Sequence, residues 1–110
     1  MEITEKTQDD TKIFNLNGRL DSNTSPEFEE RISEAIENGS KNMIIDFEAL
    51  DYISSAGLRV ILKAAKELKR ADGMLVLCSM KDYVKEVFEI AGFDSFLPIT
   101  PTMEDALKTL

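Results

Sequence analysis

The chain of 110 residues contains no histidine and only one cysteine. Without histidine, Ser-His-Asp and Cys-His catalysis are excluded, together with the commonest metal ligand. A metal site built only from carboxylates stays open, although no acidic residues show the spacing of a calcium-binding EF-hand loop. Cys78 has no partner for a disulfide within the chain. Its place in the apolar segment MLVLC predicts a buried core residue rather than a nucleophile.

Long apolar runs and an excess of positive charge are also absent. No apolar segment approaches the roughly 20 residues that span a bilayer, and residues 1–10 lack the basic and apolar regions of a signal peptide. The net charge of −8, from 13 basic and 21 acidic residues, disfavours nucleic acid and anionic membrane surfaces alike. These absences predict a cytoplasmic protein whose partners are proteins or small molecules. Nothing in the sequence demands more than a monomer.

Enzyme signatures are missing as well. The sequence contains neither a P-loop nor a G-x-G-x-x-G motif, and its carboxylates are dispersed. We therefore expect a protein that is not an enzyme and needs no cofactor. Regulatory binding of a nucleotide stays open.

The apolar pattern predicts alternating strands and helices. Residues 2–7 and 11–18 are expected to form an antiparallel hairpin around the polar turn at 8–10. Further strands are expected at 42–47, 74–78 and 96–99, and helices over 25–39, 55–73, 79–92 and 100–110. The order ββαβαβαβα predicts one α/β domain over residues 1–110. Its sheet should be mixed but mostly parallel, with about four helices packed mainly on one face.

Several residues signal where the helices begin and end. Ser25 is a plausible N-cap with Pro26 at the first helical position, and Gly39 suits a left-handed C-terminal position. Ser79 followed by Asp82 resembles a capping box for the third helix.

The helix that begins at residue 55 is expected to be amphipathic. The apolar side chains expected on one face are Leu58, Ile61, Leu62, Ala65 and Leu68. The basic side chains expected on much of the other face are Arg59, Lys63, Lys66 and Arg70.

The segment SSAG lies at the junction between a buried strand and this helix. One serine can cap the unpaired N–H groups of the first turn, while the other projects into solvent. A phosphate there would add about −1.5 to −2 charges and would be stabilised by the helix N-terminus. Ala56 and Gly57 leave room for a large anion or for a partner's backbone. The alternative is that the serines only cap the helix, and that Arg59 faces solvent instead of reaching back towards a phosphate.

The loop GRLDSNTSP, residues 18–26, is the second candidate. Strands ending at Gly18 and near Phe47 of a parallel sheet emit their loops at one edge, where ligands of α/β proteins commonly bind. Asp21 would then lie near the serines. The alternative is that Asp21 merely stabilises its own turn.

The segments GRLDSNTSPEFEERI and IIDFEALDYISSAGLRVIL resemble the anti-sigma factor antagonists, which are bacterial STAS-domain proteins. The resemblance covers nearly the whole chain, and its most specific pieces are Gly18-x-Leu20-Asp21 and Ser54-Ser55-Ala56-Gly57-Leu58. It implies a STAS-like fold and a partner switch. The unmodified antagonist binds an anti-sigma factor, typically also a serine kinase, and so releases a sigma factor. Phosphorylation of one serine ends this binding, and a PP2C-type phosphatase restores it.

On this sequence, the resemblance makes Ser55 the expected phosphosite. Ser54 is the alternative, because this chain has a second hydroxyl where many family members carry aspartate. Some members are modified at the residue just before the glycine, but here that residue is Ala56, which cannot accept a phosphate. The residues expected to contact the partner are Asp21, Ser22, Asn23, Thr24, Ser54, Ser55, Ala56, Gly57 and Arg59. A second interpretation within the same fold is the STAS subunit of a membrane lipid transporter, which would bind an ATPase subunit without a phosphorylation cycle.

Overall fold

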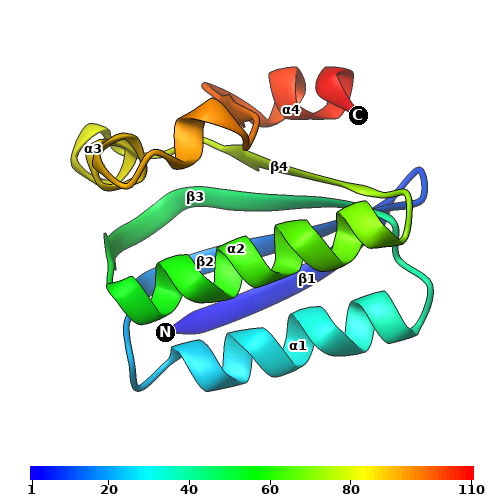
Figure 1. Cartoon of the computed structure of the whole chain (residues 1–110), viewed down its shortest axis with the longest axis horizontal. Coiled ribbons are helices and arrows are strands. Elements are labelled where there is room, and N and C mark those ends of the chain that lie inside the picture. The colour runs from blue at the N-terminus through cyan, green and yellow to red at the C-terminus, as the bar shows by residue number, and fades with distance from the viewer.

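The computed structural model describes residues 1–110 and arranges five strands in a single sheet with helices on both sides (Figure 1). The strands are β1 (Glu2–Gln8), β2 (Thr11–Leu20), β3 (Asn42–Ile53), β4 (Met74–Cys78) and β5 (Ile99–Thr100). The helices are α1 (Ser25–Glu37), α2 (Ser55–Arg70), α3 (Asp82–Ile90) and α4 (Met103–Thr109), with a 3₁₀ turn, η1 (Phe93–Ser95). The strand order is β1-β2-β3-β4-β5, antiparallel between β1 and β2 and parallel elsewhere. The predicted ββαβαβαβα order and mostly parallel sheet are confirmed.

The opening hairpin turns at two aspartates. Gln8 pairs with Thr11, which leaves Asp9 and Asp10 as a two-residue turn with φ angles of 49° and 66°. Two consecutive positive φ angles match the right-handed twist of a hairpin, and aspartate tolerates them better than most residues. The predicted antiparallel hairpin around the polar turn is confirmed.

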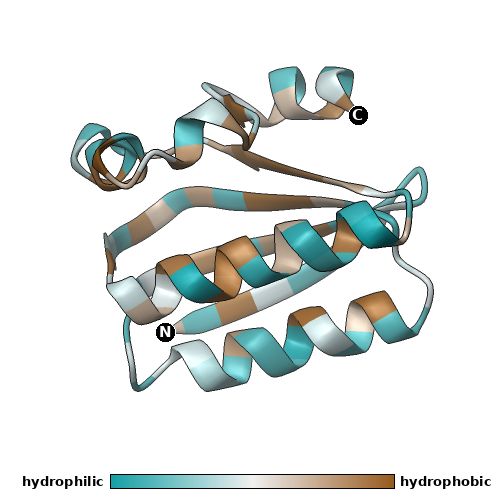
Figure 2. Cartoon of the chain, viewed as in Figure 1, coloured by the Kyte–Doolittle hydropathy of each residue, from teal (hydrophilic) through white to brown (hydrophobic).

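The sheet buries apolar side chains on both faces. Along β3, Met43, Ile45 and Phe47 point to the face covered by α1, α2 and α3, while Ile44 points to the face covered by α4. The smaller cluster beneath α4 consists of Ile13, Ile44, Val76, Cys78 and Ala106. Figure 2 shows the matching apolar and polar stripes on α1 and α2. Three helices on one face and one on the other agree with the predicted packing.

Cys78 is a core residue, as predicted. Its side chain is fully buried at the end of β4. Burial raises the pKa of the Cys78 thiol to about 11, because a thiolate would lose its hydration there. The thiol is therefore protonated at neutral pH and is not an activated nucleophile.

The pairing of β2 with β3 extends well beyond the predicted ends at residues 18 and 47. It continues to Leu20 opposite Ile53, through register shifts between Asn15 and Asn17 and between Gly18 and Arg19. These irregularities break the two-residue alternation, so residues 48–53 bury only every third side chain. Their sequence therefore does not show the pattern that predicts a strand, although they belong to β3. As a consequence, the loop predicted at residues 18–26 shrinks to residues 21–24.

Two of the predicted helix caps are wrong. Ser25 is the first residue of α1 rather than its N-cap, and its hydroxyl donates to the Asp21 carbonyl oxygen (2.6 Å) instead of accepting from an N–H. Ser79 has a φ of 62° and does not cap α3, which begins after Lys81. At the other end of α1, Gly39 has a φ of 95°, as predicted.

The last predicted strand is also shorter than expected. Only Ile99 and Thr100 pair with β4, and residues 93–95 form η1. Pro98 has no N–H to donate, so the paired strand begins after it. Its carbonyl oxygen still accepts a hydrogen bond from the Leu77 N–H (2.9 Å).

The buried face of α2 is rotated from the predicted one. Its buried residues are Gly57, Val60, Ile61, Ala64 and Leu68. The helix packs against α1 as well as against the sheet, and Ile32 of α1 shares its core cluster with Val60 and Ala64. Leu58, Leu62 and Ala65 are therefore only half-buried.

We expect Phe28→Ala to destabilise the protein by about 3–5 kcal/mol, because Phe28 is fully buried and contacts Phe14 edge-to-face at 5.8 Å between ring centroids. Urea unfolding followed by circular dichroism measures the change. The control is Phe96→Ala, at a side chain that is 55% exposed, with an expected loss below about 1 kcal/mol. Equal losses in the two variants would show that the buried contact of Phe28 with Phe14 contributes no more than an exposed ring does.

Candidate functional site

The carboxyl ends of β2 and β3 lie side by side and emit both predicted site segments. Leu20 pairs with Ile53, and the Ser54 N–H donates to the Leu20 carbonyl oxygen (2.9 Å). Asp21 and Ser54 therefore leave the sheet at the same edge. The structure brings together the two segments that the sequence suggested as neighbours.

The two serines at this edge occupy different positions. Ser54 is the N-cap of α2, and its Oγ accepts from the Gly57 N–H (3.2 Å). Ser55 is the first residue of the helix; it is exposed, and its hydroxyl makes no hydrogen bond with the rest of the chain. One hydroxyl is thus engaged in capping, while the other is free at the positive end of the helix dipole.

Gly57 allows α2 to approach the sheet closely. A Cβ placed on this buried glycine would lie 2.9 Å from both Ile53 Cγ1 and Leu20 Cγ. The contact requires the absence of a side chain rather than an unusual backbone angle. It holds the first turn of α2, and with it Ser55, against the ends of β2 and β3.

Asp21 organises the short loop between β2 and α1. Its Oδ1 accepts from the N–H groups of Asn23 (2.9 Å) and Thr24 (3.1 Å), and the Asp21 N–H donates to Thr24 Oγ1 (2.9 Å). The hydrogen bond from the Asn23 N–H is the main reason that the pKa of Asp21 is lowered, followed among the lowering causes by the hydrogen bonds from Thr24. Asp21 therefore stabilises its own turn, which leaves Ser22 and Asn23 exposed beside the serines.

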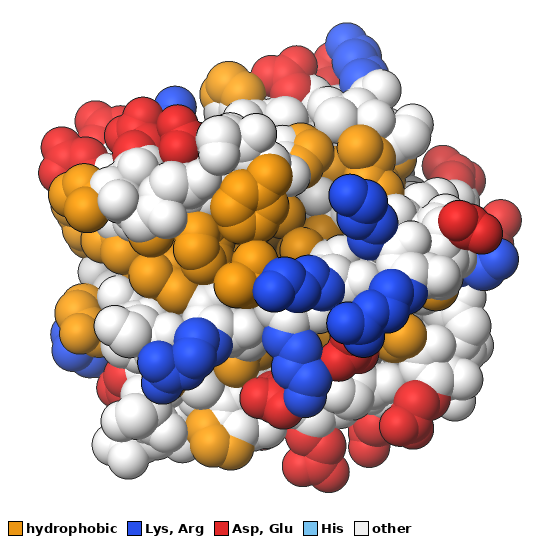
Figure 3. Space-filling model, viewed as in Figure 1, with side chains coloured by type: hydrophobic (Ala, Val, Ile, Leu, Met, Phe, Trp, Pro, Cys, Tyr) orange, Lys and Arg blue, Asp and Glu red, His pale blue; other side chains and the backbone are white.

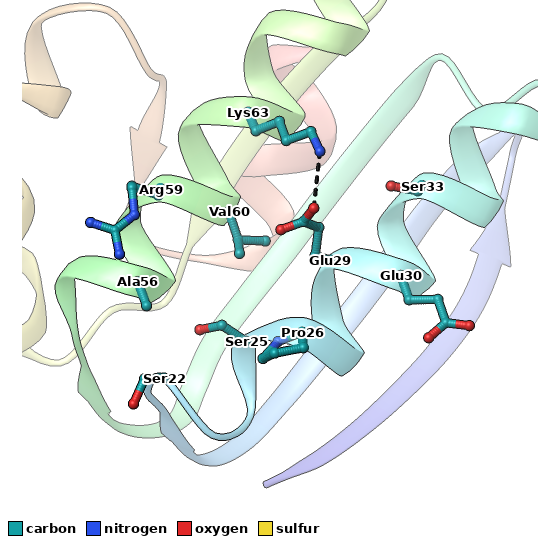
Figure 4. A pocket seen from close by; sticks show the side chains of 10 residues that line it. All are labelled: Ser22, Ser25, Pro26, Glu29, Glu30, Ser33, Ala56, Arg59, Val60 and Lys63. Atoms are coloured by element: carbon teal, nitrogen blue, oxygen red, sulfur yellow. Dashed lines mark hydrogen bonds and ion pairs between the residues drawn. The ribbon is translucent and has the colours of Figure 1, made fainter.

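A cleft of about 680 Å³ runs between the first turns of α1 and α2 (Figure 4). Ser22 and Ser25 line it from the α1 side, and Ala56 and Arg59 line it from α2. The ion pair between Lys63 Nζ and Glu29 Oε2 (2.9 Å) spans it further along. Ser55 does not line this cleft. Arg59 lies four residues later on the same helix face and forms no ion pair within the chain.

A further group of exposed side chains at this edge was not predicted. The Arg19 guanidinium lies 4.1 Å from the centroid of the Tyr52 ring, and Asp51 at the end of β3 forms an ion pair with Lys81. The hydrogen bond from Lys81 is the main cause of the lowered pKa of Asp51. Tyr52 and Tyr83 are 41% and 53% exposed. Since β4 is parallel to β3, residues just after Cys78 also belong to this edge, and that rule could have located Lys81 and Tyr83.

The arrangement contains no group of three or more acidic or cysteine side chains that could hold a metal ion. No helix has the length and apolar character needed to cross a membrane. This edge presents the free hydroxyl of Ser55 at a helix N-terminus, the polar loop held by Asp21, and two exposed tyrosines.

Comparison with known proteins identifies the family. Residues 2–106 match the STAS domain. The chain belongs to the STAS domain family. This STAS domain is 41% identical over 106 residues to BtrV from Bordetella bronchiseptica, a protein assigned provisionally as an anti-sigma factor antagonist; the match covers 96% of this chain and 91% of BtrV. It is 27% identical to an anti-sigma-B factor antagonist from Staphylococcus aureus, over 94% of this chain and 96% of that protein.

Solved structures agree with this assignment. The anti-sigma factor antagonist SpoIIAA in its unphosphorylated form matches with a TM-score of 0.77 and 25% identity, over 98% of this chain and 96% of SpoIIAA. The Bacillus cell fate determinant SpoIIAA has also been solved in its phosphorylated form, with a TM-score of 0.78 to this chain. A sulfate transporter family protein from Wolinella succinogenes matches with a TM-score of 0.80 over 94% of this chain and 87% of that chain, but at 16% identity it shows the fold alone.

We expect Gly57→Ala to destabilise this STAS domain by about 1–3 kcal/mol, because the added methyl group would have to displace Leu20 or Ile53 from a packed position. Urea unfolding measures the loss. The matched control is Ala56→Ser at the adjacent, half-buried position, for which we expect a change of at most about 0.5 kcal/mol. A neutral Gly57→Ala variant would show that the close approach is not needed.

We expect the Asp21 carboxyl to titrate below the ordinary value of about 3.9. Because the pKa in the folded state is lowered, the loop gains stability at pH values above the ordinary pKa and loses it as the pH falls through the lower folded value. NMR of the Asp21 carboxyl carbon during an acid titration gives the midpoint. Thr24→Val removes a hydroxyl donor and should move the midpoint upward. A wild-type midpoint at or above the ordinary value would contradict the hydrogen-bonded loop.

Proposed function

We propose that this STAS domain is an anti-sigma factor antagonist whose binding to an anti-sigma factor is switched by phosphorylation of Ser55. The unmodified form binds the anti-sigma factor, itself a serine kinase, and thereby frees a sigma factor. The named roles of the relatives and of SpoIIAA support the general function. The exposure of Ser55 at the start of α2 supports the switch.

The observation that carries the proposal is the difference in hydrogen bonding and exposure between Ser54 and Ser55. Ser54 is engaged as the N-cap and half-buried, whereas Ser55 is exposed and free of hydrogen bonds. A kinase can therefore reach the Ser55 hydroxyl without opening the helix. Modification of Ser54 would instead remove the acceptor of the Gly57 N–H.

A phosphate on Ser55 is compatible with the folded domain. The first turn of α2 carries unpaired N–H groups and a partial positive charge, and no acidic residue lies in that turn. Arg59, one turn further along the same face and without an ion pair, can pair with the new charge. The modification thus needs no refolding to act.

The same phosphate opposes the proposed interface. A partner surface that closes over the start of α2 buries a neutral hydroxyl at modest cost, whereas a phosphate would have to lose its hydration. A penalty of about 3 kcal/mol already weakens binding more than a hundredfold. One modification is therefore sufficient to release the partner.

The surrounding surface supplies the rest of the proposed contact. The loop from Asp21 to Thr24 lies beside Ser55, and Tyr52 and Tyr83 are exposed aromatic side chains of the kind enriched in protein interfaces. Asp21 contributes by holding Ser22 and Asn23 in place. Its own carboxylate is occupied by the loop.

The remaining parts of the proposal follow from this mode of action. The domain acts by binding and performs no chemistry itself, as a cytoplasmic monomer that neither binds nucleic acid nor inserts into a membrane. A PP2C-type phosphatase removes the phosphate from Ser55 and returns the domain to its binding form.

We expect Ser55→Ala to retain binding to the cognate anti-sigma kinase but to resist phosphorylation, and Ser55→Asp to bind at least about a hundredfold more weakly. Calorimetry measures the affinity, and mass spectrometry after incubation with kinase and ATP locates the phosphate. The matched control is Ser54→Ala, which loses about 1 kcal/mol of stability but should still be phosphorylated on Ser55.

Two results would overturn this proposal. One is phosphorylation that is absent from Ser55, or equal binding by the alanine and aspartate variants. The other is co-purification with a transporter ATPase subunit whose binding is insensitive to these substitutions, which would select the transporter-subunit interpretation.

A further inference from the structure

The second half of α2 borders a surface groove with apolar walls, here called the α2–η1 groove. It has a volume of about 440 Å³, and its apolar lining consists of Leu62, Ala65, Met74, Leu75, Phe96, Leu97 and Pro98. Phe96 is 55% and Met74 is 37% exposed, although both are large apolar side chains. Leu62, placed on the buried face by the sequence pattern, is half-buried here and is not among the apolar side chains that pack against the main core. The groove is thus an apolar surface that the chain itself does not cover.

Positive charge gathers along the same helix. α2 carries five of the 13 basic residues of the chain and only one of its 21 acidic residues. Lys66 and Lys69 line the α2–η1 groove. Figure 3 shows basic side chains crossing the middle of the molecule, beside the apolar surface.

Most of these charges are not neutralised within the chain. Lys63 pairs with Glu29 and Glu67, but Lys66, Lys69 and Arg70 form no ion pair. The chain has eight more acidic than basic residues, so acidic partners are abundant elsewhere on its surface. The helix dipole favours Lys69 and Arg70 in the last turn, but it does not account for Lys66 one turn earlier.

We infer that the α2–η1 groove binds an amphipathic helix of another protein, with acidic residues flanking its apolar face. Apolar side chains of such a helix would fill the space between Leu62 and Phe96, as in other helix-in-groove complexes. Its carboxylates would face Lys66 and Lys69 and would select against neutral or basic helices. The combination of an uncovered apolar wall and unpaired cations on its rim is complementary to this chemistry.

The inferred site is separate from the proposed switch. Lys66 lies 11 residues after Ser55 on one helix, which corresponds to about 16 Å along its axis. A helix in the groove therefore need not touch the phosphate. We expect Ser55→Asp to leave binding in the groove unchanged, so failure of either proposal can be recognised independently of the other.

Two other occupants can be tested against this inference. An anionic membrane would also meet Lys66 and Lys69, but the net charge of −8 repels it from the rest of the surface. A second copy of the chain could present its α3, where Tyr83 and Ile90 are exposed beside Glu86. Each alternative has its own measurable outcome.

The experiment titrates the isotope-labelled full chain with a designed helical peptide of about 16 residues, with leucine on one face and glutamate on the flanks. A second peptide has lysine in place of every glutamate. NMR should show shifts confined to the groove, at Leu62, Ala65, Lys66, Lys69, Met74 and Phe96, and only with the acidic peptide.

Variants then test the two features of the groove. Lys66→Glu combined with Lys69→Glu, or Phe96→Ser, should weaken binding of the acidic peptide at least about tenfold. The matched control combines Lys6→Glu with Lys85→Glu, which changes the net charge equally at two exposed lysines without ion pairs outside the groove. It should bind the peptide within about twofold of the original chain.

The inference is overturned if the acidic peptide does not bind, if both peptides bind equally, or if the shifts lie outside the groove. It is also overturned if the chain instead sediments with phosphatidylserine vesicles and Lys66→Glu combined with Lys69→Glu abolishes that sedimentation, because the occupant would then be a membrane. A concentration-dependent dimer in analytical ultracentrifugation that Phe96→Ser abolishes would likewise overturn it, in favour of a second copy.

Discussion

The contact of Gly57 with Leu20 and Ile53 is the constraint on which the arrangement of the site depends. Because no side chain separates the first turn of α2 from the ends of β2 and β3, Ser54 can donate its N–H to Leu20 and cap the helix with its hydroxyl. The next residue, Ser55, is then directed outward. The loop begun by Asp21 leaves the sheet beside it. A single close approach thus determines which serine is structural and which is accessible.

The distribution of charge divides the helix α2 into two regions. Its first turn has no acidic residue and offers free N–H groups, so it tolerates an added phosphate. Its second half carries Lys66 and Lys69 beside an apolar groove. An acidic protein gains little stability from such exposed, unpaired cations. In our proposals, these cations recognise negative charge: Arg59 that of a phosphate on Ser55, and Lys66 and Lys69 that of the inferred acidic helix.

Much of the fold was predictable because local signals agreed with the tertiary structure. The strands of the hairpin, a serine cap at the start of α2, the left-handed Gly39 and the buried segment ending at Cys78 follow from residue patterns that act over a few positions. Predictions failed where a neighbour intervened. Ser25 turned its hydroxyl towards the Asp21 carbonyl, and residues 48–53 became a strand because β2 continued beside them. Tyr52 was missed because β3 extends beyond the predicted end at residue 47, and Tyr83 was missed because the edge also includes the residues that follow β4.

The sequence by itself determined the order of elements, the mostly parallel sheet and the presence of two hydroxyls at a helix start, since hydrophobic periodicity and capping are local properties. Only the tertiary structure decided how these hydroxyls differ, because that depends on how closely α2 approaches Leu20 and Ile53. It also decided that Leu62 borders a groove rather than the core. The rotation of a helix about its axis is set by all the surfaces that pack against it, here the sheet and α1 together, and a periodic pattern of apolar residues does not contain that information.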